Sequence, residues 1–173
     1  LVILSIAVGV FAIGMTTNAG RIIKRDMNQQ YLATNPDSAT LYVSPFGEQL
    51  VAAVQGLRQV NRVEARRIES AEILLQDDSW DDLTLNAMQE YEDVQINRFE
   101  IEKGSTTPGH RETFLERQTA DYLGLSIGDN MTVRLPGRER SYDLLVTGIV
   151  HDLHAVPPEL LLQTNAYVSM ETL

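Results

Sequence analysis

The chain has 173 residues, 43% of them hydrophobic, which is enough for one domain, or one domain of two lobes, with its own core. Its formal net charge of -10, from 14 basic and 24 acidic side chains, argues against binding nucleic acid or docking the domain face on an anionic lipid surface. The chain contains no cysteine, so disulfide bonds and thiolate chemistry are both excluded.

The first segment, residues 1–20, is uncharged, and the first charge is that of Arg21. As a helix, this run would be roughly 30 Å long, about the thickness of a hydrocarbon core. We therefore expect residues 1–20 to form a transmembrane helix. Because the numbering begins inside the apolar run, we expect this helix to be truncated at its start. Two other interpretations stay open: a signal peptide, with residues 17–19 as a poor cleavage site, and a buried core helix.

Residues 21–34 continue the helical pattern, with Ile23 and Met27 on one side, and predict a stalk helix that extends into water. Arg21, Lys24 and Arg25 follow the apolar run directly, and the positive-inside rule would place this end in the cytoplasm. Long domains translocate largely regardless of charge, so this cluster conflicts with an external domain without excluding it.

A mixed α/β (porter-like) lobe is expected over residues 35–110 together with 165–173. The turn residues 35–38 end the stalk, and strands are expected at 40–44, 60–75, 83–88 and 94–101. An amphipathic helix is expected at 45–57, because its apolar residues recur at helical spacing. A final strand at 165–170 is expected to return to this lobe. The overall fold class is α+β.

A smaller, β-rich lobe is expected over residues 111–164. A helix is predicted from Glu112 to Leu123, with Gly124 just after its end. A tight turn at 126–129 then leads to a strand around Met131 and Val133, and a second strand is expected at 142–150. The second strand carries apolar residues on both faces, so we expect both faces to be buried, in a hairpin that could close into a small barrel.

The sequence carries no catalytic, metal-binding or cofactor-binding motif, which predicts a protein that is not an enzyme and uses no cofactor. His151 and His154 have the spacing of two metal ligands, but no third ligand is evident, and solvated loop histidines are the simpler interpretation. The aspartates at 77, 78, 81 and 82 lack the spacing of a calcium loop and predict an acidic hairpin tip. Trp80, inside that tip, either caps the core or contacts a partner.

Three stretches resemble the extracytoplasmic core domain of FtsX/MacB-like permeases of ABC transporters. They are residues 115–133, LERQTADYLGLSIGDNMTV, residues 142–153, YDLLVTGIVHDL, and residues 166–173, AYVSMETL. The apolar residues 1–15 stand where the first membrane helix of that family is expected. The resemblance covers essentially the whole chain, but it is a diffuse pattern of hydrophobic, Gly and Asp positions.

This resemblance implies a non-catalytic domain on the extracytoplasmic side of the cell membrane, coupled by its long first helix to ATP-driven motion. The implied partners are a separate cytoplasmic ABC ATPase subunit, a second permease in a dimer, and a periplasmic adaptor or a lipoprotein or lipid-like cargo. An alternative is a secreted or membrane-anchored binding module with a cleaved signal peptide.

A contact surface for a partner is predicted from loop placement and expected exposure. It comprises the acidic tip, with Asp78, Trp80 and Asp81, and the polar loop 104–109, with Thr106 and Thr107.

Overall fold

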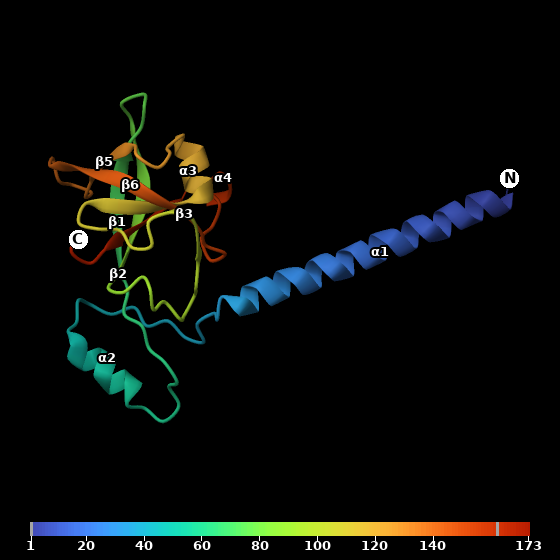
Figure 1. The fold of residues 1–173 in the computed structure, drawn as a ribbon, viewed down its shortest axis with the longest axis horizontal. Helices are drawn as coiled ribbons and strands as arrows, with labels where there is room; N and C mark the ends of the chain where they lie inside the picture. The colour runs from blue at the N-terminus through green and yellow to red at the C-terminus, as the bar shows by residue number, and fades with distance from the viewer. Residues whose placement is uncertain (1, 162) are drawn as a thin grey trace.

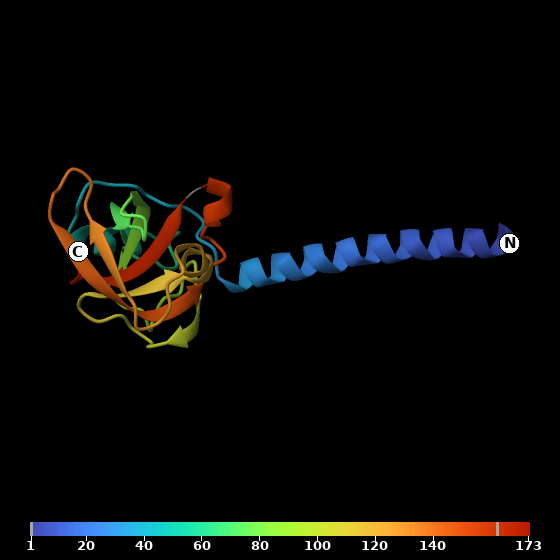
Figure 2. The same cartoon turned by 90° about the horizontal axis from the view of Figure 1, so that it is seen from above.

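The structure is a computed structural model that describes residues 2–161 and 163–173. The side chains of residues 1–14, 16, 17, 159, 161 and 162 lie outside the described part. A single long helix projects from a body built around a β-sheet, and the N-terminus lies at the far end of this helix (Figures 1 and 2).

The long helix, α1, runs without interruption from Val2 to Ala33. The predicted membrane segment and the predicted stalk thus form one helix over residues 2–33, which ends, as predicted, at the turn cluster where Asn35 has a φ of 51°. Within the described residues, no helix combines the length and the apolar character that crossing a membrane requires. The predicted span of residues 1–20 therefore finds no support, and most of its side chains lie outside the described part.

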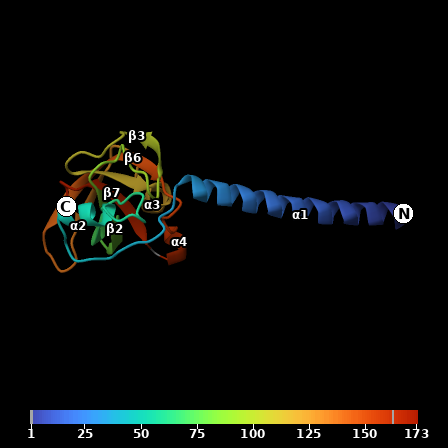
Figure 3. The same cartoon turned by 90° about the horizontal axis from the view of Figure 1, so that it is seen from below.

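Residues 34–47 form a loop, which leads to the short helix α2, Glu48–Gln55. The helix predicted at 45–57 is therefore present but shorter, with Gly47 at its N-cap. The strand predicted at 40–44 was wrong: these residues pair with no strand in the described part of the chain. A strand needs a neighbour for its backbone groups, and the alternation of Leu41 and Val43 alone does not supply one. Figure 1 shows α2 below the sheet-bearing body, and in Figure 3, which is seen from below, α2 lies in front of that body.

The remaining elements belong to one sheet and the helices beside it. The strands are β1 Arg67–Leu74, β2 Trp80–Met88, β3 Glu100–Gly104, β4 Glu112–Glu116, β5 Asn130–Arg134, β6 Ser141–His151 and β7 Thr164–Ser169. The helices are α3 Arg117–Leu123 and α4 Pro158–Leu161.

The sheet closes on itself because β6 is long enough to pair with three strands. In the described residues the order is β3-β6-β4-β7-β2-β1-β5, with a further pairing between β5 and β6. The first half of β6 pairs with β5 and its second half with β3, whereas β4 pairs with its central and later residues. A ring therefore runs β1-β2-β7-β4-β6-β5 and back to β1. The strands of both predicted lobes take part in this ring, and the division of the chain into two lobes stays a prediction.

The helix predicted from Glu112 to Leu123 was half wrong. Its first part, Glu112–Glu116, is the strand β4, and only Arg117–Leu123 is helical. Residues 113–116 are all buried, because β4 lies between β6 and β7 and is covered on both faces. The helix then begins at Glu116, whose carboxylate Oε2 accepts hydrogen bonds from the backbone N–H groups of Gln118 and Thr119, at 2.6 and 3.3 Å. It ends at Gly124, with a φ of 67°, as predicted.

Neighbouring residues of β4 point into two separate cores. Leu115 belongs to a cluster that contains residues from all the other strands of the ring, so this cluster fills the inside of the ring. The cluster comprises Ala71, Ile73, Leu83, Leu85, Ala87, Leu115, Ala120, Met131, Val133, Leu144, Val146, Ala166 and Val168. Phe114 joins Met88, Tyr91, Val150 and Tyr167 in a second cluster, against which Val94, Phe99 and Ile101 pack. The β6 residues Leu145 and Ile149 are only half buried, so the predicted burial of both faces of β6 holds on one face and is partial on the other.

Candidate functional site

The end of α1 is attached to the body by backbone hydrogen bonds. The N–H group of Arg98 donates to the carbonyl oxygen of Thr34 at 2.8 Å, and that of Asn97 donates to the carbonyl oxygen of Asn35 at 3.1 Å. The Asn35 side chain donates from Nδ2 to the carbonyl oxygen of Gln95 at 2.6 Å. The chain leaving α1 is thereby fixed to the loop that precedes β3. We call this contact, together with Tyr31, His154, Asp152 and Tyr167, the helix joint.

His154 attaches the last turn of α1 to the segment that follows β6. Its Nε2 lies 2.9 Å from Oγ1 of Thr34, and its ring lies 5.4 Å from that of Tyr31, tilted by 48°. Thr34 Oγ1 also lies 2.7 Å from the Tyr31 carbonyl oxygen, to which it donates. Because a hydroxyl carries one hydrogen, Thr34 accepts from His154, whose Nε2 is the donor.

His154 is held in turn by a buried carboxylate. Its backbone N–H donates to Oδ1 of Asp152 at 2.8 Å, and the hydroxyl of Tyr167 donates to Oδ2 of Asp152 at 2.6 Å. Tyr167 is 2% exposed in strand β7, and its burial, together with the neighbouring Asp152 carboxylate, raises its pKa well above the ordinary value. A hydrogen-bonded path therefore leads from the second core, through Asp152 and His154, to the end of α1.

The loop 95–98, which precedes β3, is also held by a reciprocal pair of hydrogen bonds between Asn97 and Asp37. Asn97 Nδ2 donates to Oδ1 of Asp37 at 2.8 Å, and the Asp37 N–H donates to Oδ1 of Asn97 at 2.9 Å. Hydrogen bonds from Thr40 and then from Asn97 hold the pKa of Asp37 below its ordinary value. Oε1 of Glu64 accepts from the N–H groups of residues 95 and 96, at 2.7 and 3.1 Å. The loop 95–98 is thus fixed from both ends.

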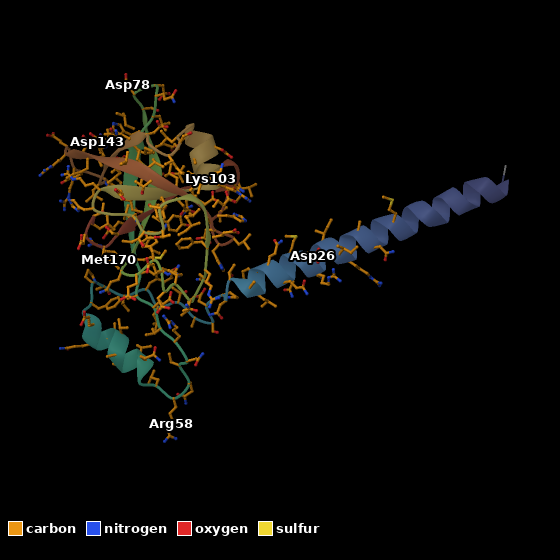
Figure 4. The ribbon with its side chains drawn as sticks, in the orientation of Figure 1. Asp26, Arg58, Asp78, Lys103, Asp143 and Met170 are labelled. Carbon is orange, nitrogen blue, oxygen red and sulfur yellow. The ribbon has the colours of Figure 1, made fainter. Side chains whose placement is uncertain are left out.

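The predicted acidic tip is the turn between β1 and β2. Asp78, with a φ of 63°, lies at the end of this hairpin, on the opposite side of the body from Arg58, which follows α2 (Figure 4). Trp80 is half buried, and the guanidinium of Arg134 lies 3.8 Å from the centre of its ring. Asp81 accepts a hydrogen bond from the Tyr122 hydroxyl at 3.2 Å. Trp80 is therefore partly covered by a cation of its own chain and partly accessible.

Thr106 and Thr107, the other predicted contact residues, are exposed in the connection between β3 and β4. They belong to a different connection from the acidic tip, and within the described residues no hydrogen bond or ion pair joins the two groups. The structure therefore does not assemble the five predicted residues into one surface patch, and their role in partner binding stays a prediction.

The two histidines of the predicted ligand-like spacing do different things. His151 Nδ1 lies 3.9 Å from Oε1 of the buried Glu116, and its Nε2 lies 3.4 Å from the Arg117 guanidinium. His154 instead contacts α1. Across residues 2–161 and 163–173, no group of three or more acidic, histidine or cysteine side chains is arranged to hold a metal ion. The interpretation of both residues as solvated loop histidines was wrong, because both are half buried and have partners.

The sequence identified the turn at 35–38 and singled out His154, but it did not bring them together. The signal present in the sequence was one cluster of polar residues at the end of the long helix and a second cluster after the long strand. Nothing local indicates that these two clusters meet.

Comparisons with known proteins add the family. A model of the family described as MacB-like periplasmic core domain matches residues 1–173. The periplasmic region of MacB from Actinobacillus actinomycetemcomitans is similar at 14% identity and a TM-score of 0.50, over 80% of this chain and 63% of that one. A domain of a protein described as a permease from Porphyromonas gingivalis is similar at 10% identity and a TM-score of 0.45, over 62% of this chain and 45% of that one.

This chain thus spans between 45% and 63% of the length of these two solved structures. A search of curated proteins found no match. The structural likeness concerns the fold, whereas the family match extends from the first residue to the last. The chain belongs to the family of MacB-like periplasmic core domains.

Proposed function

We propose that this chain is the extracytoplasmic domain of the permease subunit of an ABC transporter, and that it couples movement of the membrane part to the handling of a partner or cargo outside. The family match over residues 1–173 supports the transporter assignment. The domain is non-catalytic: ATP is hydrolysed by a separate cytoplasmic subunit, and two permeases form a dimer. The uncharged residues 2–20 of α1 lie nearest the membrane in this proposal.

The observation that carries the coupling role is the helix joint. A helix that projects from a body through a flexible linker would transmit neither rotation nor displacement. Here the chain leaving α1 is fixed by two backbone hydrogen bonds to Asn97 and Arg98, and the last turn is fixed by His154. These contacts give two packed elements one defined relative position, which is what a transmitted movement needs. A shift of α1 is therefore expected to move the sheet with it.

The coupling role predicts that ATP changes the distance between the two copies of α1. In the complete permease, assembled with its ATPase subunit and carrying no other cysteine, Lys24→Cys places one spin label on the exposed surface of each α1. Pulsed electron paramagnetic resonance is expected to show a different distance distribution when a non-hydrolysable ATP analogue is bound. An ATPase subunit that cannot bind nucleotide is the control and should abolish the change. Identical distributions in all nucleotide states would contradict the proposed function.

The acidic tip is the proposed contact for an external partner, either an adaptor protein or a lipoprotein or lipid-like cargo. Trp80→Ala combined with Asp81→Lys removes the ring and reverses one charge, and loss of a hot-spot tryptophan costs at least about 2 kcal/mol of binding. We expect transport in cells to fall while the far-ultraviolet circular dichroism is unchanged. Arg138→Ala, in the exposed turn between β5 and β6, is the matched control. Intact transport in the double variant would exclude the tip.

A further inference from the structure

The short helix α2 is held by contacts of its last turn with the residues that follow it. Figure 1 shows α2 apart from the sheet, and none of its residues is buried. Oε1 of Gln55 accepts a hydrogen bond from the N–H group of Val63 at 3.0 Å, and its Nε2 donates to the carbonyl oxygen of Asn61 at 3.2 Å. The side chain of Gln55 thus fastens the end of α2 to residues 61–66, the segment that precedes β1, which we call the strap.

Glu64, in the middle of the strap, binds the loop 95–98. Its Oε1 accepts hydrogen bonds from the N–H groups of Gln95 and Ile96, at 2.7 and 3.1 Å. Its Oε2 lies 3.3 Å from Nη2 of Arg66, and its side chain is 17% exposed. Hydrogen bonds to a carboxylate are stronger than those between neutral groups, and partial burial lessens their screening by water. Glu64 is therefore the principal contact between the strap and the loop.

Two arginines extend this contact along the loop. Arg62 donates from Nη2 to Oδ2 of Asp93 at 2.6 Å and to the Asp93 carbonyl oxygen at 3.2 Å, and Arg66 donates to the carbonyl oxygen of Ile96. The hydrogen bond from Arg62 holds the pKa of Asp93 below its ordinary value. Arg62 and Asp93 are both well exposed, so their ion pair adds little by itself. Alternate residues of the strap thus face the same stretch of chain, as side chains of an extended segment do.

The same loop holds α1. Residues 95 and 96 donate to the strap, whereas the next two residues, Asn97 and Arg98, donate to the carbonyl oxygens of Asn35 and Thr34 at the end of α1. The two helices are therefore attached to consecutive peptide groups of one short loop, and the path between them passes through hydrogen bonds of loop residues. Elements fixed to one segment keep one relative position and can pass a displacement from one to the other.

We propose that α2 moves together with α1 as one unit, with the strap as the link and Glu64 as its positioning residue. This assignment rests on the proposed function and deepens it, because α2 becomes a part of the external domain that a shift of α1 reaches. Every contact that forms the link lies within the chain, so the link does not depend on whether α2 is exposed or covered in the complete permease.

The link can be measured as the width of the distance distribution between α1 and α2. The complete permease, with no other cysteine, carries spin labels at Lys24→Cys on α1 and Gln49→Cys on the exposed surface of α2, and is diluted with unlabelled permease so that each pair of labels lies in one copy. Pulsed electron paramagnetic resonance should show a narrow distribution in the parent and a distinctly broader one with Glu64→Ala. The substitution leaves two N–H groups without their acceptor, which should raise the ratio of released to attached strap roughly 10- to 150-fold.

Three comparisons distinguish a released strap from a damaged fold. Glu72→Ala is the matched control and should leave the distribution narrow, since Glu72 also pairs with an arginine at 2.6 Å and its side chain is 27% exposed, but it lies in the sheet. Glu64→Gln keeps an acceptor for the two N–H groups and should restore most of the narrow distribution. Labels at Lys24 and Lys103 should stay narrowly distributed in Glu64→Ala, because His154 still holds α1 to the body.

Several results would each overturn the proposal. A broad distribution in the parent would show that α2 does not move with α1. An equally narrow one in Glu64→Ala would show that something other than the strap, such as another part of the complete permease, positions α2. Equal broadening by Glu72→Ala, or of the distribution between Lys24 and Lys103, would indicate a general loosening of the fold. A Glu64→Gln variant as broad as Glu64→Ala would remove Glu64 as the positioning residue.

The proposed function and this link can fail separately. One label per copy at Gln49→Cys reports the distance between the two copies of α2, which should change when the non-hydrolysable ATP analogue is bound and should lose that change in Glu64→Ala. The labels at Lys24 should respond to the analogue in both. If the Lys24 labels do not respond, the proposed function fails, whereas the broadening caused by Glu64→Ala still supports the link. If the Lys24 labels respond and the Gln49 labels of the parent do not, the link fails and the coupling role of α1 stands.

Discussion

Replacing Phe114 by alanine should lower the free energy of unfolding by about 3 to 5 kcal/mol. Phe114 is fully buried in strand β4, and its ring packs edge-on against Tyr91 with centroids 5.6 Å apart. Its neighbours Val150 and Tyr167 are themselves in paired strands, so they cannot move into the space that the ring leaves. Urea unfolding followed by the fluorescence of Trp80, the single tryptophan of the chain, measures the loss. Phe46→Ala, at a position that is 44% exposed, should change stability much less.

Gly148 provides a sharper version of this experiment. A Cβ atom at Gly148 would lie 2.6 Å from Cδ1 of Phe114, so the ring rests directly on the backbone of β6. Gly148→Ala should therefore cost about 1 to 3 kcal/mol in the wild-type chain by overpacking. In the Phe114→Ala background the same change places a methyl group in the cavity and should cost little. Additive losses in the double variant would show that the two residues are not in the predicted contact.

Sequence patterns predicted the local elements well where one face of an element is buried and its ends carry turn residues. The uninterrupted helical pattern up to residue 33 and the turn cluster from Asn35 placed the end of α1 correctly. Gly124 at the end of α3 and the alternation of Met131 and Val133 in β5 were also confirmed. In each case the signal depends on neighbouring residues alone, such as a residue that must adopt a positive φ or an apolar residue at every second position.

The errors occur where the tertiary structure covers both faces of a segment. Residues 113–116 were predicted to belong to the start of a helix, because Leu115 and Thr119 are four residues apart, as they would be on one face of a helix. The sheet instead buries all four residues, Thr113 to Glu116, between two strands and two cores. At residues 40–44 the reverse applies: the strand pattern is present but no partner strand is found in the described chain. Local periodicity reports neither outcome, because both depend on distant strands.

The helix joint could not be predicted for the same reason. Its central contact joins Thr34 and His154, which are 120 residues apart in the sequence. Polar residues were expected at both places, but their meeting follows from the route of β6 around the ring.

The predicted partner-contact residues differ among themselves. Asp78, Thr106 and Thr107 are exposed in connections between strands, whereas Trp80 and Asp81 are half buried at the start of β2. Exposure alone does not show that Asp78 and Thr106 share a function.

A substitution in the helix joint should have the second large effect, on the attachment of α1 to the body. His154→Ala should loosen the attachment of α1 to the body, because it removes both the hydrogen bond to Thr34 and the ring contact with Tyr31. A hydrogen bond contributes about 0.5 to 1.5 kcal/mol and an aromatic pair a similar amount, so the attached arrangement should lose about 1 to 3 kcal/mol. That loss corresponds to roughly 5- to 150-fold in the ratio of attached to detached arrangements. Since the hydrogen bonds donated by Asn97 and Arg98 remain, α1 should pivot about the chain at residues 34–35 rather than separate.

Two labels on the cysteine-free chain measure this loosening directly. Lys24→Cys lies on the exposed surface of α1 and Lys103→Cys at the exposed end of β3, so pulsed electron paramagnetic resonance reports the position of the helix relative to the sheet. The distance distribution should be narrow in the doubly labelled parent chain and distinctly broader with His154→Ala. His110→Ala, which removes an exposed loop histidine away from α1, should leave the width unchanged. If His154→Ala also leaves it unchanged, His154 does not hold the helix, and the transmission of movement through α1 would have to depend on the loop 95–98 alone.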